Sequence, residues 1–169
     1  MRRSRASGFS LIELMVTIAI VAILLALGLP SFEGSMRSNR VATTTNEMLA
    51  SLALARSEAI RSSRDSVLCA SDDGLACDDT LDWNAGWIVA MDDNRDGTFE
   101  RVVRYVQAHP RLVFAGTAAT PIEFDYRGRP DAAGTITLQP DQCPSGQELR
   151  RTMTMNIVGQ ITTTRGTCT

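Results

Sequence analysis

The chain has 169 residues, of which 44% are hydrophobic, and a formal net charge of −2 at pH 7. This length allows one soluble domain with its own core. The near-neutral charge gives no general reason to expect nucleic acid as the main partner. Charge is nevertheless uneven along the chain, because Arg2, Arg3 and Arg5 precede a stretch, 14–32, that has no ionisable side chain.

The uncharged stretch predicts a membrane segment. As an α-helix it would reach about 28 Å at 1.5 Å per residue, roughly the hydrocarbon thickness of a bilayer. By the positive-inside rule the N-terminal arginines stay on the cytoplasmic side, so everything after Phe32 should lie outside. If residues 1–8 are then removed, 14 arginines face 19 acidic residues, a side-chain charge of about −5.

Glu13 stands at the start of this apolar stretch. An ionised carboxylate at the centre of a membrane helix costs about 2.5 to 3.5 kcal/mol, so a carboxylate kept there is expected to have a partner. If the chain is cut between Gly8 and Phe9, the new amine lies four residues before Glu13, and a neighbouring copy could offer its amine to this carboxylate. The alternative is that Glu13 lies near the headgroups and is solvated.

A secretory signal peptide is the competing interpretation of the N-terminus. Its small-x-small cleavage site would be Ala26-Leu27-Gly28. Glu13 inside the apolar region and the length of that region, about 20 residues where signal peptides have 7 to 15, argue against it. A mature chain that begins at Phe9 would favour the first interpretation, and one that begins at Leu29 the second.

These residues resemble the type IV prepilin signature, a short basic leader ending in Gly, then Phe, then an apolar run with Glu four residues after the Phe. Pro30 also sits where many pilins carry a helix-bending proline. The resemblance implies cleavage after Gly8 by a cytoplasmic prepilin peptidase and methylation of the Phe9 amine. It also implies that apolar side chains such as Leu14 pack with Glu13 into a filament core.

The helical pattern continues beyond Pro30 to about Ser63. Pro30 removes a backbone donor, so a bend is expected there. Apolar residues then recur at spacings of three, four or seven, as on a helix that packs one face on a sheet. These residues are Val41, Met48, Leu52, Ala55 and Ala59.

From Asp65 onward the sequence predicts short strands between turn residues. The expected strands are Val67–Ala70, Trp87–Met91, Arg101–Val106, Leu112–Phe114, Ile122–Tyr126, Thr135–Leu138, Arg151–Ile157 and Gln160–Thr163. Met153, Met155 and Ile157 should share one face, with a turn at Val158-Gly159. The fold class is α+β: residues 1–8 form a leader, 9–32 a membrane and filament-core helix, 33–63 a helical spine, and 64–169 an antiparallel β-sheet head.

Four cysteines are expected to lie outside the cytoplasm, where disulfides form. Three pairings are possible, and short loops favour Cys69 with Cys77 and Cys143 with Cys168. A zinc site is the alternative, but the chain has no C-x-x-C pair and a single histidine, His109.

Trp83-Asn84-Ala85-Gly86-Trp87, followed by an Asp/Asn/Gly-rich turn, resembles the entry to the sheet in GspH/FimT-type minor pilins and pseudopilins. The spine segment 54–60 is similar to theirs as well. This resemblance implies a low-abundance subunit that primes or caps a filament. Implied partners are other minor and major pilins, the prepilin peptidase, the assembly platform and the inner membrane.

Two groups of charged residues are candidate ion or ligand sites. Asp92, Asn94, Asp96 and Gly97 match the opening of an EF-hand calcium loop, with Glu100 at the ninth position. The twelfth position, where a bidentate Glu belongs, is Val103, so a hairpin turn with solvated carboxylates is the preferred interpretation. Asp72, Asp73, Asp78, Asp79 and Asp82 form an acidic run, either a solvated loop or a contact for an arginine-bearing subunit.

Arginines near the C-terminus could form a basic strip for DNA. They are Arg150, Arg151 and Arg165, with Arg127 and Arg129 in an earlier turn. Some relatives bind DNA through a Gly-Arg-x-Arg turn, but the corresponding residues here are Gly159-Gln160-Ile161-Thr162, which puts DNA binding in doubt.

No catalytic constellation is present. His109 precedes Pro110, and the sequence has no Gly-x-Ser-x-Gly, no phosphate loop and no His/carboxylate metal cluster. We expect no enzyme and no cofactor. The predicted function is that of a minor pilin of a type IV pilus, held in the inner membrane with its head in the periplasm. The alternatives are a type II secretion pseudopilin and a DNA-uptake minor pilin.

Overall fold

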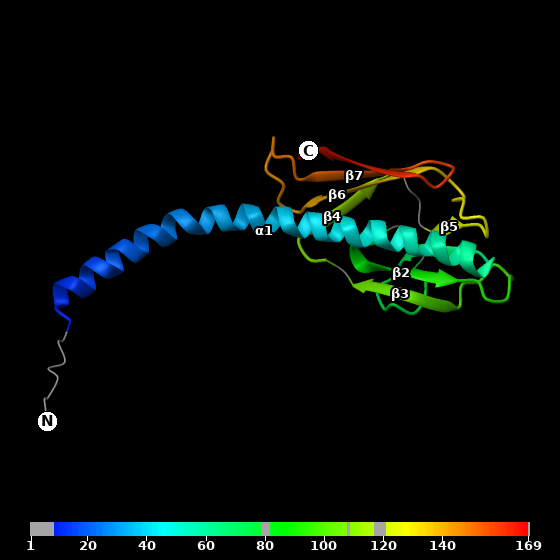
Figure 1. Ribbon diagram of the computed structural model, residues 1–169, viewed down its shortest axis with the longest axis horizontal. Helices are drawn as coiled ribbons and strands as arrows, with labels where there is room; N and C mark the ends of the chain where they lie inside the picture. Colours follow the sequence, from blue (N-terminus) through cyan, green and yellow to red (C-terminus); the bar gives the residue numbers. More distant parts are fainter. Residues whose placement is uncertain (1–8, 79–81, 108, 117–120, 169) are drawn as a thin grey trace, which may run out of the picture. The chain divides into compact units, whose positions relative to one another are not determined.

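The computed structural model describes residues 9–78, 82–107, 109–116 and 121–168 (Figure 1). It divides into two compact units, Met1–Arg37 and Ser38–Thr169. Helix α1, Leu11–Ser62, contributes to both units. It ends one residue before the predicted end at Ser63. Its residues 38–62, which lie within the predicted spine 33–63, belong to the same compact unit as the strands.

The N-terminal unit is an apolar helix with exposed side chains. It contains a stretch long and apolar enough to cross a membrane, and none of that stretch is buried by the described residues. The only charged side chains that follow the stretch within this unit, Glu33 and Arg37, pair at 3.7 Å. An unshielded apolar helix of this kind requires lipid or other apolar helices around it.

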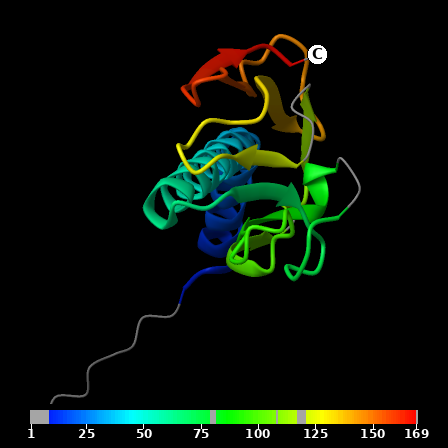
Figure 2. The same cartoon turned by 90° about the vertical axis from the view of Figure 1, so that its right-hand side faces the viewer.

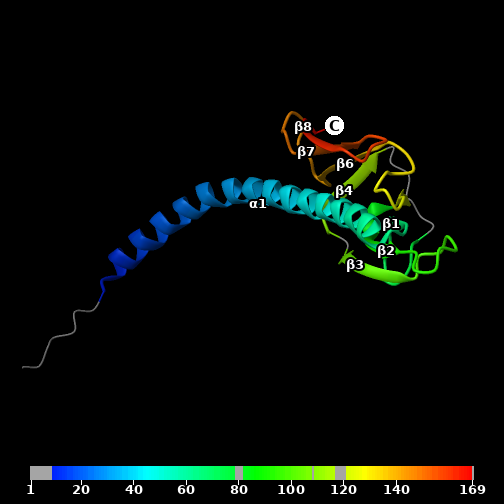
Figure 3. The same cartoon turned by 45° about the vertical axis from the view of Figure 1, so that its right-hand side comes forward.

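The described residues of the second unit form eight strands in two antiparallel sheets. The strands are β1 Ser66–Ala70, β2 Gly86–Met91, β3 Arg101–Gln107, β4 Leu112–Gly116, β5 Ile122–Phe124, β6 Gly134–Pro140, β7 Arg150–Met155 and β8 Ile161–Gly166. One sheet has the order β3-β2-β1-β5 and the other β4-β6-β7-β8. Figures 1 and 2 show the two sheets on different sides of the second half of α1, and Figure 3 shows the β4-β6-β7-β8 sheet along that helix.

The core lies between this half of α1 and the two sheets. All five predicted spine residues, Val41, Met48, Leu52, Ala55 and Ala59, are at most 2% exposed. Trp87 joins the layers: its Nε1 donates to Ser51 Oγ on α1 at 2.9 Å, and its ring meets Phe114 of β4 edge-on, with centroids 5.6 Å apart. The amide oxygen of Asn84 accepts the backbone N–H of Phe114 at 2.9 Å, which links the Trp-x-x-Gly-Trp segment to the second sheet.

Every predicted strand is present, but two end earlier than predicted. Strand β5 stops at Phe124 because Asp125 Oδ1 accepts the backbone N–H groups of Arg127 and Arg129 in the following turn. Strand β7 stops at Met155 because Asn156 Oδ1 accepts those of Val158 and Gln160. These side chains replace ladder hydrogen bonds.

One predicted orientation is wrong for the same reason. Ile157 was expected to share the buried face of Met153 and Met155, but it lies in the turn and is 69% exposed.

Candidate functional site

The candidate assembly site is the first turn of α1. The helix begins at Leu11, and the hydroxyl of Ser10 accepts the backbone N–H of Glu13 at 3.2 Å. Glu13 therefore lies in the first turn, where the helix dipole favours negative charge. Among the described residues Glu13 has no ion-pair partner, whereas Glu33 at the other end of the apolar segment has Arg37.

The capping role of Ser10 was missed by sequence reasoning. Its signal is Ser followed three residues later by Glu, the capping-box spacing. Phe9 is 85% and Leu14 57% exposed, so both are available to other helices. Gly8 lies outside the described residues. Pro30 lies within α1, and its side chain is outside what the structure describes.

Both favoured disulfides are formed. Cys69 of β1 is bonded to Cys77, with a Cα–Cα distance of 5.5 Å, and Cys143 to Cys168, at 5.4 Å. The first bridge closes part of the acidic run, where the carboxylate of Asp73 accepts the backbone N–H of Leu75 at 2.8 Å. That hydrogen bond is the largest of the causes that lower the pKa of Asp73. Asp82 caps the short helix η1 (Trp83–Ala85), so these two acids act within their own loops; Asp79 lies outside the described residues.

The calcium-like loop is folded by its own hydrogen bonds. Carboxylate oxygens of Asp92, Asp96 and Glu100 lie within 4.8 Å of one another. Asp92 is buried, and its oxygens accept the backbone N–H groups of Asn94, Arg95 and Gly97. Val103, at the twelfth position, lies in β3 and offers no carboxylate. These are oxygen donors of the type that calcium prefers, but the loop's most buried acid is already satisfied by backbone donors.

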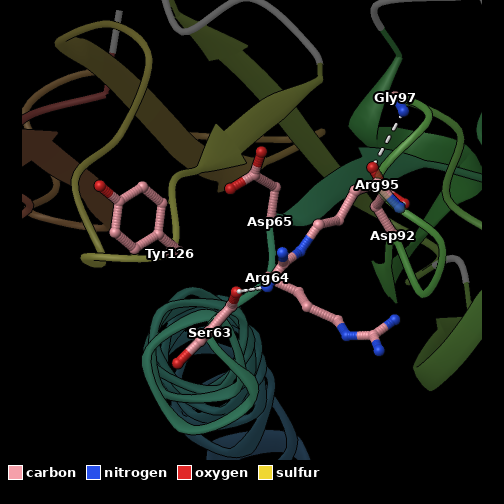
Figure 4. A pocket seen from close by; sticks show the side chains of 7 residues that line it. All are labelled: Ser63, Arg64, Asp65, Asp92, Arg95, Gly97 and Tyr126. Carbon is pink, nitrogen blue, oxygen red and sulfur yellow. Dashed lines mark hydrogen bonds between the residues drawn. The ribbon is translucent and has the colours of Figure 1, made fainter.

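A depression of about 600 Å³ lies between this loop and the end of α1 (Figure 4). Its lining mixes charges of both signs, from Arg64 and Arg95 and from Asp65 and Asp92. Arg95 donates to the carbonyl of Ser63 at 3.3 Å, and so caps the C-terminus of the helix. The lining residues have structural roles and form no nucleophile and base pair.

The C-terminal arginines do not form one strip. Arg150 and Arg151 are adjacent in β7, so their side chains point to opposite faces of the sheet. Arg151 is paired in register with Arg165 of β8, and the two share a face. Arg151 is 7% exposed and donates to the carbonyls of Glu148 and Arg150. Burial, followed by the charge of Arg165, lowers its pKa.

His109, the lone histidine, has a structural environment. Its Nε2 lies 2.7 Å from a carboxylate oxygen of Glu47 on α1, and its ring lies 5.9 Å from that of Trp87. The pair ties the connection between β3 and β4 to the helix.

Comparison with known proteins identifies both parts of the chain. The family model "Type II transport protein GspH" matches residues 44–159, and the "Prokaryotic N-terminal methylation motif" matches residues 3–29. Two proteins of Pseudomonas aeruginosa named "Fimbrial protein" are each 33% identical over 101 residues, which is 56% of this chain and 65% of theirs.

Solved structures of the type IV minor pilin FimU from Pseudomonas aeruginosa have the same fold. In one crystal form the TM-score is 0.57 at 19% identity, over 73% of this chain and 87% of FimU; in another it is 0.55 at 20%, over 73% and 91%.

These matches confirm the predicted pilin fold, with one long N-terminal helix and antiparallel sheets, and the expected anchoring of a soluble head through an apolar helix. Pilins are structural subunits, so the prediction of a non-enzymatic protein is also confirmed. The chain therefore belongs to the GspH family of type IV pilin-like proteins, the group of minor pilins and pseudopilins.

Proposed function

We propose that this chain is a minor pilin of a type IV pilus that primes or caps filament assembly and thereby supports twitching and adhesion. Its similarity to fimbrial proteins and the fold of FimU support this role over that of a catalyst or a soluble binding module. Before assembly it resides in the inner membrane with its head in the periplasm. Prepilin peptidase cuts between Gly8 and Phe9, and the Phe9 amine is methylated.

The observation that carries the proposal is the carboxylate of Glu13 at the start of an exposed apolar helix, which has no ion-pair partner in the part of the chain that the structure describes. In a filament the Phe9 amine of an adjoining subunit would neutralise it. Both groups lie at helix N-termini, so the pair fixes the axial position of one helix against the next. The apolar side chains, among them Leu14, then pack between subunits.

Substitution of Glu13 by Gln tests this mechanism. Gln keeps the size of the side chain but cannot attract an amine, so we expect incorporation into sheared filaments to fall about tenfold or more, since a charge-assisted pair at low dielectric contributes several times RT. The matched control is Glu33→Gln, which removes a charge that already has a local partner in Arg37. Normal filament incorporation of Glu13→Gln would overturn the mechanism.

The second candidate is a minor pseudopilin of type II secretion, favoured by the description of the matching family model. Deletion separates the two, because loss of twitching indicates the pilus and loss of protein secretion the secretion machine. A DNA-uptake role has weaker support in the arginine pair Arg151 and Arg165. It requires loss of transformation on deletion, and a salt-dependent gel shift lost in alanine variants of Arg150, Arg151 and Arg165.

A further inference from the structure

Strand β8 is an edge of the second sheet that the described residues leave uncovered. It pairs with β7 in unbroken register over Ile161–Gly166, without a bulge or a proline. Thr162, Thr163, Thr164 and Arg165 are all exposed. An exposed, regular edge of this kind is a template for another strand.

The other three sheet edges each carry a protective feature. At the β3 edge, the pairing with β2 shifts register between Val89 and Ala90, and Arg101 and Arg104 add charge. Strand β5 is followed by Pro130, which bridges back to Phe124. On β4, the N–H of Phe114 is occupied by the side chain of Asn84. Bulges, charges and covering groups are the devices that prevent edge pairing, and β8 has one charge at its end.

The outward backbone groups of β8 can be assigned from the ladder. Asn156 and Gln160 are bonded next to the turn, with the N–H of Asn156 donating to the carbonyl of Gln160 at 3.1 Å. Hydrogen-bonded pairs alternate in an antiparallel ladder, so Thr162 and Thr164 bond to β7, while Ile161, Thr163 and Arg165 direct their N–H and C=O groups outward. These three residues also share one side-chain face.

An apolar groove lies beside the start of this edge. It is an open groove of about 310 Å³, lined mostly by apolar side chains such as Ile161 of β8, Phe124, and Ala53 and Ile60 of α1, with Arg56 also in its lining. A strand added to β8 would direct the side chain opposite Ile161 toward this groove, whose size accepts a leucine or phenylalanine.

The other end of the same face carries positive charge that has no ion pair among the described residues, although the charge of Glu148 acts on Arg151 from farther away. Arg165 is four residues from Ile161 and lies on the same face, opposite the buried Arg151. Among the described residues neither arginine has a carboxylate within ion-pair distance. Like charges paired directly across a ladder destabilise it, so an acidic side chain here would relieve the repulsion.

We propose that the free edge of β8 accepts an extended strand of another filament subunit, with an acidic residue facing Arg165 and an apolar residue, four positions later, facing the groove beside Ile161. That order belongs to an antiparallel strand, the direction of every other pairing in this sheet. Only the source of the strand, a filament subunit, rests on the proposed function.

The test uses the full processed chain in detergent and a labelled nine-residue peptide. The peptide carries Glu, Val and Leu at alternate positions on one face and Thr and Lys on the other, and its binding is followed by fluorescence anisotropy. Binding should depend on the pattern, so a peptide of the same composition with Glu and Leu on opposite faces should bind at least about tenfold more weakly. Equal binding of the two peptides, or binding of neither, overturns the proposal.

Variants of β8 locate the site. Thr163→Pro removes an outward N–H that β7 does not use, and should weaken binding about tenfold or more, whereas Thr163→Ala should not. The Arg165→Glu variant should no longer bind the peptide that carries Glu. It should instead bind a version of the peptide in which Lys replaces that Glu. The control Arg111→Glu reverses an exposed charge beside β4, the opposite edge of the sheet, and should leave binding unchanged.

Ala53→Trp fills the groove from α1 without altering β8. It should weaken binding of the leucine peptide and leave a version with Ala at that position unaffected. Near-ultraviolet circular dichroism of each variant reports whether the head is folded. Arg165→Gln replaces Arg165→Glu if the Glu variant is unfolded, and the comparison of the two peptides on the unaltered chain tests the edge if Thr163→Pro is unfolded. If the folded variants Thr163→Pro, Arg165→Glu and Ala53→Trp all bind the peptide normally, the β8 site is overturned. That result is independent of whether Glu13→Gln blocks filament incorporation, so the two proposals can fail separately.

Discussion

At the scale of single residues, Arg56 closes the junction between α1 and two hairpin turns. Its guanidinium donates to the carbonyls of Gly159 at 2.7 Å and Val158 at 3.1 Å. A Cβ on Gly159 would lie 3.1 Å from both the Arg56 guanidinium carbon and the carbonyl oxygen of Gly128. The glycine in each turn therefore allows the helix and both turns to approach closely.

This contact predicts an unequal cost of two glycine substitutions. Gly159 and Gly146 both have positive φ, +75° and +83°, but an added Cβ at Gly146 meets nothing within 4 Å. Both alanine variants should lose roughly 1 kcal/mol to the left-handed backbone. Gly159→Ala should lose about 1 kcal/mol more, because Arg56 must move. Thermal melting followed by near-ultraviolet circular dichroism compares them, and equal shifts would contradict the contact.

Glu123 gives a pH-dependent prediction. Burial, with Asp131 and Asp65 nearby, raises its pKa above the usual value near 4.5. The folded state therefore holds this proton more tightly than the unfolded state, and its contribution to stability is present below about pH 4.5 and lost as pH rises through the folded pKa.

Glu123→Gln should therefore raise the melting temperature at pH 7, and the gain should shrink as the pH falls toward 4. Exposed Glu148→Gln is the matched control for removing one acidic side chain. A gain of the same size at both pH values would show that burial and the neighbouring acids are not its cause.

At the scale of elements, the sequence predicted all eight strands and the buried face of α1. Local signals suffice for these, because alternation and turn residues define strands such as β7, and a period near 3.6 defines the helix face. The strand order could not be predicted, because β1 pairs with both β2 and the distant β5. Such pairings depend on long-range packing that no local pattern encodes.

The candidate sites divide in the same way. Phe9 and Glu13 could be proposed as site residues from the sequence because the whole leader pattern is contiguous. The juxtaposition of Arg151 with Arg165, and the contact of Arg56 with Gly159, each required knowing which strands are neighbours. The strand ends at Asp125 and Asn156 had a local signal, an Asx residue three positions before a glycine, which the strand assignments overlooked.

The two disulfides should contribute unequally to stability. Cys143 and Cys168 are 25 residues apart, and Cys69 and Cys77 are 8 apart. Loop-closure entropy then predicts that replacing Cys143 and Cys168 by alanines lowers the free energy of unfolding by about 3.5 kcal/mol. Replacing Cys69 and Cys77 should lower it by about 2.5 kcal/mol. Denaturant midpoints of the two double-alanine variants measure the difference, and a larger loss for Cys69 with Cys77 would show that native packing around β1 outweighs chain entropy.

At the scale of the whole molecule, the chain joins two units with opposite requirements. The unit Ser38–Thr169 buries its own core, whereas the apolar helix of Met1–Arg37 leaves its side chains exposed. The unit Ser38–Thr169 thus has a core of its own, while in the proposed function the apolar helix exchanges lipid for the helices of other subunits. What converts the anchored form into the assembling form, in the proposed function, is the creation of a new amine at Phe9.

Blocking that cleavage should separate membrane insertion from assembly. In a Gly8→Arg variant the leader stays attached, so the Phe9 amine is never formed and Glu13 of the neighbouring subunit has no partner. We expect mass spectrometry to find Phe9 methylated at the N-terminus of the wild-type chain. The variant should retain residues 1–8, remain in the membrane with both disulfides formed, and be absent from filaments.

Gly34→Ala is the matched control, since an added Cβ there meets nothing within 4 Å and the leader is unchanged. It should be cleaved and incorporated normally. A wild-type chain that begins at Leu29 would mean that the apolar helix is removed as a signal peptide. In that case Glu13 could not take part in assembly, and the head would have to join filaments through surfaces such as the β8 edge alone.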